Sequence, residues 1–374
     1  MRRKRRIPPS PLPQREGVDP VRVRLPAEGS WATVREHLVE RLAADSGVVE
    51  GMFDAGQVVG TDGRAVAPDT AYMPGMLVWF HRELRAEVPV PFPVEVVHRD
   101  EHIVVADKPH FLATTPRGSH VTQTVLARLR RELDIPALGA AHRLDRLTAG
   151  LVLFTVRPEE RGAYQALFRD RRIHKEYEAI APYDPGLALP RTVRSRIVKE
   201  RGVPAAYEVE GEPNAVSRVE LTELREGDEP GGAGGPTGSP GPDRPTGACR
   251  PDGTATPEGT RRSDGTGRPD GTGRPDRTRL GRYRLTPATG QTHQLRVHMN
   301  ALGVPILGDP LYPVVTGPVP AGDFRRPLQL LARCLEFTDP VTGVEHRFRS
   351  GRVLEAWTSY DDWAAPYDAG SAGQ

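Results

Sequence analysis

The nonapeptide His142-Arg143-Leu144-Asp145-Arg146-Leu147-Thr148-Ala149-Gly150 places one carboxylate between two guanidinium groups, directly before the apolar run Leu151-Val152-Leu153-Phe154. A short apolar run predicts a buried strand, so Asp145 is expected to be partly buried where that strand begins. Burying a charge is costly unless the charge is paired. Two interpretations follow. Asp145 forms a structural ion pair at a loop-to-strand junction, or it is a positioned nucleophile or base beside arginines that hold a polyanion.

The length and charge of the chain limit its domain number and the partners that it can bind. A chain of 374 residues is typical of two domains with linkers. The 51 Lys and Arg residues nearly balance 49 Asp and Glu, for a net charge of +2, so total charge does not indicate a nucleic-acid binder. The positive residues are clustered, at 2–6 and again at Arg169, Arg171, Arg172, His174 and Lys175. Such runs are usually solvated faces and less often bind phosphates.

Cysteine content and hydropathy indicate the compartment. Cys249 and Cys334 are the two cysteines, and their spacing suits neither a disulfide framework nor a zinc site. No apolar run is long enough to cross a bilayer, and the basic N-terminus lacks the apolar segment of a secretory signal. We therefore expect a cytoplasmic protein without membrane contact.

The N-terminal part divides into a tail and a small module. Residues 1–16 are basic and rich in proline, and we expect them to be disordered. Residues 17–90 predict a small α+β domain, with a helix over 31–42 followed by short strands that include 48–53 and 76–80.

The remainder, residues 91–225 and 281–362, predicts a domain in which strands dominate. Helices are expected at 121–133, 158–170 and 291–302, and strands at 94–98, 103–106, 173–181, 207–210, 218–224 and 282–286, with a closing hairpin over 328–348. Since regular βαβ alternation is absent, the pattern favours an α+β fold with a mixed, mainly antiparallel sheet. Residues 226–280 are rich in Gly, Pro, Arg and Asp, and are expected to be a disordered insert between two strands.

Three segments carry polar groups that no structural role obviously requires. The groups are Arg143 and Asp145, Lys175 and Tyr177, and the series Thr292, His293, Gln294, Arg296 and His298. His293 and Arg296, three residues apart, would share one face of the expected helix. His293 and His298, five apart, would not, so a zinc site is rejected. Gln291 and Gln294 are interpreted as surface residues.

Four motifs in this order resemble those of the RluA-like family of pseudouridine synthases, over residues 94–352 without the insert. They are Asp100-Glu101-His102 with Val104-Val105 and Lys108-Pro109; His142-Arg143-Leu144-Asp145 with Thr148 and Gly150; Lys175-Glu176-Tyr177-Glu178-Ala179; and Thr289-Gly290-Gln291-Thr292-His293-Gln294-Leu295-Arg296-Val297-His298, followed by Pro305-Ile306-Leu307-Gly308-Asp309. Residues 17–84 more loosely resemble the small RNA-binding domain found in front of many members.

The chain departs from the family pattern at three positions. Gln291 stands where the family usually has arginine, Ala149 where serine is common, and Leu331 where histidine is frequent. The first departure would weaken an RNA backbone contact, and none of the three changes the expected catalytic carboxylate.

The resemblance implies isomerisation of uridine to pseudouridine in ribosomal or transfer RNA, by a monomer that uses no cofactor and no metal. Asp145 would attack the anomeric carbon of the ribose or abstract a proton from the sugar. Tyr177 would stack on the target uracil, and Arg296 would pair with Asp145. These three residues would form the catalytic set and should face one another in one cleft.

Further residues would bind the RNA. Arg143 would fill the gap left by the flipped base, since a guanidinium plane can stack and bind phosphate. Leu295 would form a pocket wall, and His142 and His293 would support the loop. Phosphate contacts are expected from the basic tail, Arg146, Arg169, Arg171, Arg172 and Lys175.

Two alternatives remain. The first is a catalytically silent RNA-binding protein of the same fold, which would bind RNA without forming product. The second is a carboxylate-based hydrolase acting on nucleosides or glycans, which needs a second acid near Asp145.

Overall fold

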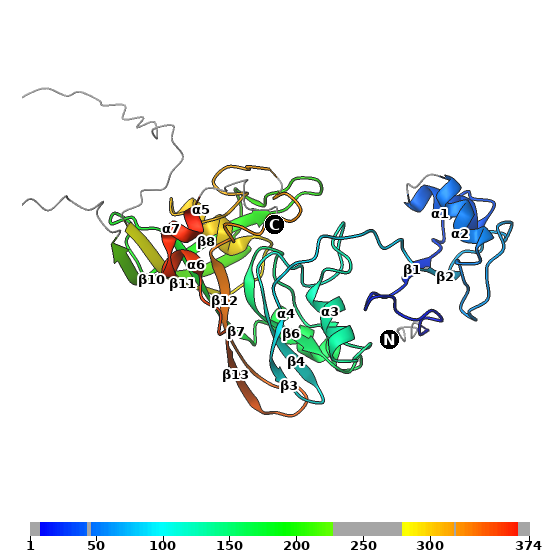
Figure 1. Cartoon of the computed structure of the whole chain (residues 1–374), viewed down its shortest axis with the longest axis horizontal. Coiled ribbons are helices and arrows are strands. Elements are labelled where there is room, and N and C mark those ends of the chain that lie inside the picture. The colour runs from blue at the N-terminus through cyan, green and yellow to red at the C-terminus, as the bar shows by residue number, and fades with distance from the viewer. Residues whose placement is uncertain (1–7, 43–45, 227–278, 318, 366–374) are drawn as a thin grey trace, which may run out of the picture.

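The computed structural model describes residues 8–42, 46–226, 279–317 and 319–365. Disorder is expected for residues 1–16 and 226–280, of which 1–7 and 227–278 lie outside the described residues. Residues 8–16 are described, and Glu226, Arg279 and Leu280 belong to strands. The chain forms a small N-terminal module, which stands to one side, and a larger part built on one sheet (Figure 1).

The N-terminal module is a two-stranded sheet covered by two helices. Strand β1 (Val21–Arg24) pairs antiparallel with β2 (Leu77–Phe80), and the helices are α1 (Val34–Leu42) and α2 (Ser46–Asp54). The expected helix over 31–42 is confirmed, whereas the strand expected at 48–53 is wrong. Val49 and Phe53 are both buried and lie four residues apart, so the short apolar run follows the helical period.

The large sheet has eleven strands in the order β3-β4-β6-β12-β7-β11-β10-β8-β9, with β13 paired to β12 and β5 to β6. Their bounds are β3 (Glu95–Arg99), β4 (Ile103–Lys108), β5 (Gly139–Ala140), β6 (Ala149–Thr155), β7 (His174–Pro182), β8 (Arg191–Val198), β9 (Tyr207–Val209), β10 (Ala215–Glu226), β11 (Arg279–Pro287), β12 (Leu330–Thr338) and β13 (Glu345–Arg349). Strands β6 and β12 run parallel, and the other pairs of this sheet are antiparallel. The expected α+β fold with a mixed, mainly antiparallel sheet is confirmed.

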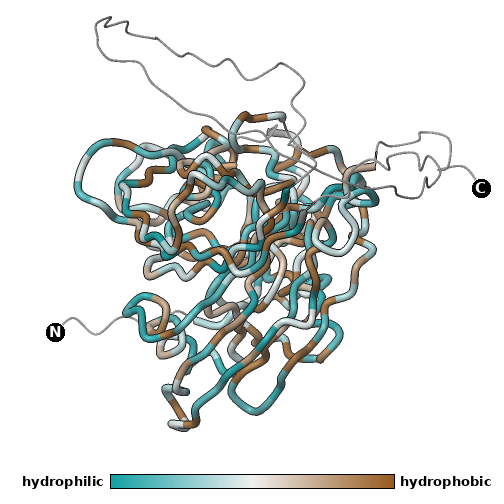
Figure 2. The backbone as a smooth tube through the Cα atoms, turned by 90° about the vertical axis from the view of Figure 1, so that its left-hand side faces the viewer, coloured by the Kyte–Doolittle hydropathy of each residue, from teal (hydrophilic) through white to brown (hydrophobic). Residues whose placement is uncertain are grey.

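Burial is greatest in β6, which continues the nonapeptide, and in β4, which pairs with β6. Every residue of β4 and of β6 is buried, which confirms the strand predicted from the apolar run at 151–154. Apolar segments (brown) run through the interior of the molecule, whereas many outer loops are hydrophilic (teal), in Figure 2. The last two residues of the nonapeptide, Ala149 and Gly150, are therefore the first residues of a fully buried strand.

The helices lie between the strands in sequence. They are α3 (Val125–Glu132), α4 (Arg161–Arg169), α5 (Gln294–Ala301), α6 (Glu355–Thr358) and α7 (Tyr360–Ala364). Helix α3 begins four residues later than expected, because the side chain of Thr124 accepts a hydrogen bond from the Ala127 amide and caps the helix. Helix α5 begins three residues later than expected, because the residue before it, His293, has a left-handed backbone with φ of 58°.

Two segments tie the module to the sheet. Residues 14–19 lie against α3, where Arg130 donates to the Gly17 carbonyl at 3.0 Å and to the Asp19 carboxylate at 3.1 Å. In the segment after β2, Glu87 accepts hydrogen bonds from the Val121 and Thr122 amides at 2.9 and 2.7 Å. Within the part of the chain that the structure describes, none of the helices has the length and apolar character needed to span a lipid bilayer.

Candidate active site

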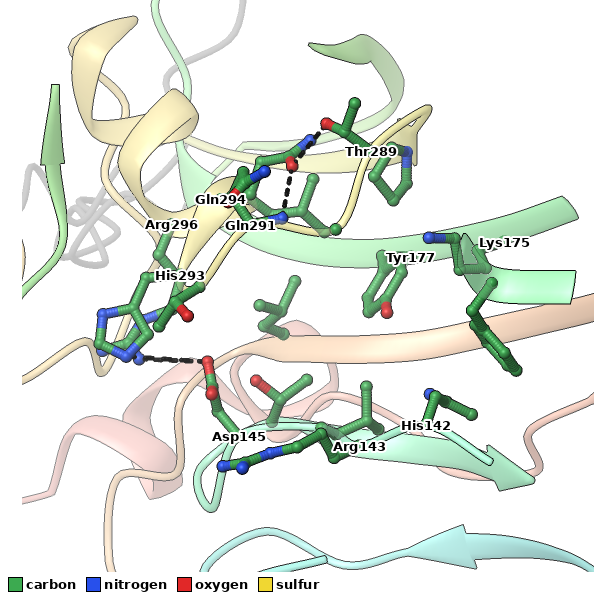
Figure 3. Close-up of a pocket in the computed structure, with 18 of the residues that line it drawn as sticks. His142, Arg143, Asp145, Lys175, Tyr177, Thr289, Gln291, His293, Gln294 and Arg296 are labelled. Atoms are coloured by element: carbon green, nitrogen blue, oxygen red, sulfur yellow. Dashed lines mark hydrogen bonds and ion pairs between the residues drawn. The ribbon is translucent and has the colours of Figure 1, made fainter. Parts of the chain in front are cut away.

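A cavity of about 800 Å³ lies where the loop before β6, strand β7 and the loop before α5 meet (Figure 3). Its walls contain most of the expected site residues. The lining includes His142, Arg143, Asp145, Lys175, Tyr177, Leu295, His293 and Arg296, together with Phe168, Gln291, Gln294 and Leu330. The three segments that the sequence analysis singled out therefore meet in one place.

The loop that carries Asp145 is held on both sides by hydrogen bonds. The Thr114 hydroxyl donates to the Leu144 carbonyl at 2.8 Å and accepts from the Leu144 amide at 3.1 Å. The Thr148 amide donates to the Asp145 carbonyl at 3.1 Å. Because its neighbours are fixed, the Asp145 side chain is positioned, yet 34% of it remains exposed to the cavity and solvent.

Lys108 also holds the loop that carries Asp145. Its Nζ is buried at the end of β4 and donates to the carbonyls of Pro109, Leu112 and Arg146, at 3.0, 2.8 and 3.2 Å. Burial lowers the pKa of Lys108 to about 7, although the charge of Asp145 opposes the shift. The lysine of the first motif is thus a structural support, which the sequence analysis did not assign.

Gly150 ends the loop at a position where a side chain does not fit. Its φ is +110°, and a Cβ atom would lie 2.3 Å from the carbonyl oxygen of Ala332 on β12. The close approach belongs to the parallel pairing of Gly150 with Ala332. The glycine of the nonapeptide is therefore required for β12 to pack beside β6.

Arg296 lies between two carboxylates. Its side chain is 3% exposed and donates to both oxygens of Asp309, at 2.7 and 2.6 Å, while its other terminal nitrogen lies 3.8 Å from Asp145 Oδ2. Burial disfavours the charged guanidinium, but the hydrogen bonds and charge of Asp309 outweigh it and raise the pKa of Arg296. The expected pairing with Asp145 is therefore the longer contact, and the main partner is Asp309, which the sequence analysis did not identify.

Tyr177 lies on β7 and lines the same cavity as Asp145. Burial, and then the negative charge of Asp145, raise the pKa of Tyr177 well above its usual range. The phenol is therefore protonated at neutral pH. In the view of Figure 3, Asp145 lies between Tyr177 on one side and His293 with Arg296 on the other.

The two histidines of the motifs have different surroundings. His142 Nε2 accepts from the Leu153 amide at 3.1 Å, and the ring stacks on Phe168 with centroids 4.2 Å apart. Burial, and then the charge of Lys175, lower the pKa of His142 to about 3. His293, by contrast, points toward Asp145, with Nε2 3.9 Å from Oδ2.

Gln294 is buried, so its assignment to the surface is wrong. Its amide nitrogen donates to the Val216 carbonyl and Ser217 hydroxyl at 3.0 and 2.8 Å, and its amide oxygen accepts from Thr289 and from the Gln291 amide at 2.7 and 3.0 Å. The side chain thus fastens the loop before α5 to β10. Gln291 is exposed, as expected.

Basic side chains surround the cavity. Arg117, Arg143, Arg169, Arg171, Lys175 and Lys199 belong to its lining. The expected RNA contact Arg146 is not among them; it is half-buried, and burial lowers its pKa. Arg172 also lies outside the wall, 4.0 Å from Asp170. The positive rim suits a polyanion such as RNA.

The hydrolase alternative lacks a second acid. Among the described residues that line the cavity, Asp145 is the only carboxylate. The nearby Asp309 has a fully buried side chain that is held by Arg296, so it is not free to transfer protons.

Comparison with known proteins places the chain in a family. The family model described as RNA pseudouridylate synthase matches residues 102–301, just over half of the chain. A dual-specificity RNA pseudouridine synthase RluA from Pasteurella multocida is 28% identical over 264 residues, which cover 67% of this chain and 89% of the relative. The ribosomal large subunit pseudouridine synthase D of Pseudomonas aeruginosa is 26% identical over 272 residues, covering 69% of this chain and 68% of the relative.

Among solved structures, human RNA pseudouridylate synthase domain containing 1 matches with a TM-score of 0.45 and 18% identity, over 70% of this chain and 84% of that one. The family match covers the Asp145 loop, the Tyr177 strand and the Arg296 helix. This chain belongs to the RNA pseudouridylate synthase family and is an RNA pseudouridine synthase, an isomerase.

Proposed function

We propose that this protein isomerises specific uridines of ribosomal or transfer RNA to pseudouridine, with Asp145 as the catalytic carboxylate. The observation that carries the proposal is the position of Asp145 in the cavity. The carboxylate is one-third exposed, lies 3.8 Å from the buried Arg296, and shares its cavity with Tyr177.

The geometry supports a different role in the reaction for each of Asp145, Arg296 and Tyr177. The target nucleotide leaves the stack to reach the cavity. Asp145 then acts on the sugar, as a nucleophile at the anomeric carbon or as a base toward a sugar proton. Arg296 holds positive charge beside that carboxylate, and the protonated Tyr177 offers a ring face to the uracil.

The rim residues would bind the RNA around the target. Arg143 is exposed and lines the cavity, so its planar guanidinium can take the place of the flipped base. Lys175 and Leu295 line the cavity and complete the proposed binding set. We also propose that the protein acts as a monomer, which size-exclusion chromatography with light scattering would test.

The proposed RNA classes are supported by the relatives' names, which include a dual-specificity enzyme and a ribosomal large subunit enzyme. Mapping pseudouridines in ribosomal and transfer RNA of a strain lacking the gene, with and without complementation, identifies the target. If the strain lacking the gene keeps every pseudouridine in both classes of RNA, the proposed substrates are contradicted.

The role of Asp145 is tested by tritium release from RNA containing uridine labelled at carbon 5. Asp145→Asn keeps the size of the side chain and removes its charge, and should reduce release to background. Asp323→Asn, which changes an acid outside this cavity, should release tritium as wild type does. Equal release from Asp145→Asn and wild type would exclude the carboxylate mechanism, and RNA binding without release by the wild type would favour the silent alternative.

A further inference from the structure

His293 has an unusual backbone for a residue with a large side chain. Its φ is 58°, in the left-handed region, and it directly precedes α5, whose first bond runs from the Val297 amide to its carbonyl at 2.9 Å. Non-glycine residues rarely adopt this conformation, and it concentrates at functional sites. Here it directs a side chain that is only 10% exposed toward the cavity.

Tyr312 determines which ring nitrogen of His293 carries a proton. The Tyr312 hydroxyl donates its single proton to the Ala206 carbonyl, at 2.7 Å. His293 Nδ1 lies 3.1 Å from the same oxygen, which has only lone pairs left to offer. Nδ1 therefore donates to Tyr312. In a neutral imidazole this leaves Nε2 without a proton, as a hydrogen-bond acceptor.

The charges around the ring favour that neutral form. Burial, and then the positive charge of Arg296, lower the pKa of His293 below its ordinary 6.5, and Lys199 acts in the same direction. The negative charges of Asp145 and Asp309 oppose the shift without reversing it. At neutral pH, Nε2 and the Asp145 carboxylate thus form two acceptors 3.9 Å apart, on the wall of one cavity.

Two adjacent acceptors call for a donor from the substrate. Asp145 must reach the anomeric carbon or a proton of the sugar, whichever route the reaction takes. The hydroxyl nearest to both positions is the ribose 2′-hydroxyl, which is absent from DNA. We propose that His293 Nε2 accepts a hydrogen bond from the 2′-hydroxyl of the target nucleotide, and so orients the sugar over Asp145 and selects ribose over deoxyribose.

This inference rests on the proposed function, and two variants separate it from a merely structural role. Asn at position 293 tolerates a left-handed backbone and can donate to Tyr312, but has no atom at the Nε2 position. Gln reaches that position with an amide oxygen. His293→Asn should therefore lose the contact, and His293→Gln should restore part of it.

The probe is a pair of short RNAs that carry pseudouridine or 2′-deoxypseudouridine at the mapped target, because product-form RNAs do not react further. We expect the wild type to bind the ribose form about 3- to 10-fold more tightly, because this is the gain in affinity that one additional hydrogen bond typically gives. In His293→Asn this preference should fall to less than about 2-fold, and in His293→Gln it should recover in part. An undiminished preference in His293→Asn would overturn the proposal.

The tautomer is tested separately in the free wild-type protein. Nitrogen-15 labelling of histidine should show neutral His293 protonated at Nδ1, with the signal assigned by its loss in His293→Asn. Protonation at Nε2 would overturn the proposal even if the variants fail to fold. A wild type that forms no pseudouridine refutes the proposed function, and this inference with it. An active wild type without the ribose preference refutes only the inference.

Discussion

Arg296 donates to both carboxylate oxygens of Asp309, at 2.7 and 2.6 Å, on the side of the guanidinium that faces away from Asp145. Asp309 also accepts from the Leu311 amide at 2.9 Å, and its side chain is fully buried. The arginine is thus fixed by one acid, and it presents positive charge to another acid without closing onto it. Asp145 keeps its access to the cavity for this reason.

Asp309→Asn should damage both stability and turnover. Removing one charge of a buried pair leaves the other uncompensated, at a cost of about 3–5 kcal/mol in the free energy of unfolding. The guanidinium would then turn to Asp145, so we expect kcat to fall by about 10-fold or more, equivalent to about 1.4 kcal/mol. Urea unfolding and single-turnover tritium release measure the two effects.

The matched control for this change is Asp323→Asn. Asp323 makes a two-point contact with Arg325 at 2.8 and 2.7 Å, but in an exposed pair. Exposed pairs contribute about 0–1 kcal/mol, so this variant should resemble wild type. If both variants unfold at the same urea concentration, burial is not what makes the Arg296 pair important.

Gly150→Ala should be strongly destabilising, since its Cβ would meet the Ala332 carbonyl oxygen at 2.3 Å. The backbone conformation alone costs about 1–3 kcal/mol for a residue with a Cβ, and the contact with β12 adds to this. Gly162→Ala is the control, because Gly162 lies in α4 with open space around it. Alanine there should stabilise the helix by about 0.5–1 kcal/mol, and thermal unfolding of both variants checks the contrast.

His142 should make the fold sensitive to acid. Its folded pKa of about 3 lies below the unfolded value of 6.5, so the unfolded chain binds more protons between these pH values. Stability is therefore fully present above pH 6.5 and is lost as pH falls toward 3, by at most about 1.4 kcal/mol per pH unit from this residue. His142→Gln, which does not titrate, should show a shallower decline in urea unfolding. Parallel curves for the two proteins would argue against this source of acid sensitivity.

Gln291→Arg should strengthen RNA binding. Gln291 is exposed on the cavity wall, and its side chain makes one long contact, to the Asn214 carbonyl at 3.4 Å. An added phosphate contact should tighten binding at low salt and steepen the slope of log K against log salt by about 0.7–0.9. Gln165→Arg, on the exposed side of α4 and outside the cavity wall, should leave the slope unchanged. Equal slopes for both variants would mean that RNA phosphates do not pass position 291.

The sequence predicts the meeting of Asp145, Tyr177 and Arg296 because each belongs to a motif with a distinct pattern. It does not predict Asp309 as the partner of Arg296, although Asp309 ends the segment 305–309 that was quoted after the last motif. The available signal was physical: an arginine among apolar residues needs an acid that binds both of its nitrogens.

The other differences have similarly local causes. The run at 48–53 is too short for periodicity to distinguish a strand from a helix, and only its packing decides. Gln294 looks like a surface residue in sequence, because its partners Ser217 and Val216 come from a strand almost eighty positions earlier. No sequence pattern around His293 predicts its left-handed backbone.

The parallel pairing of β6 with β12 also has a consequence for the order in which the molecule is built. Gly150 meets Ala332, and β12 in turn separates β6 from β7. During synthesis the Asp145 loop leaves the ribosome long before the strand that joins it to Tyr177. Contacts so distant in sequence form slowly, and until they form the edge of β6 is exposed to other chains. The sheet that joins the Asp145 loop to Tyr177 therefore cannot be complete until β12, which ends at Thr338, has been translated.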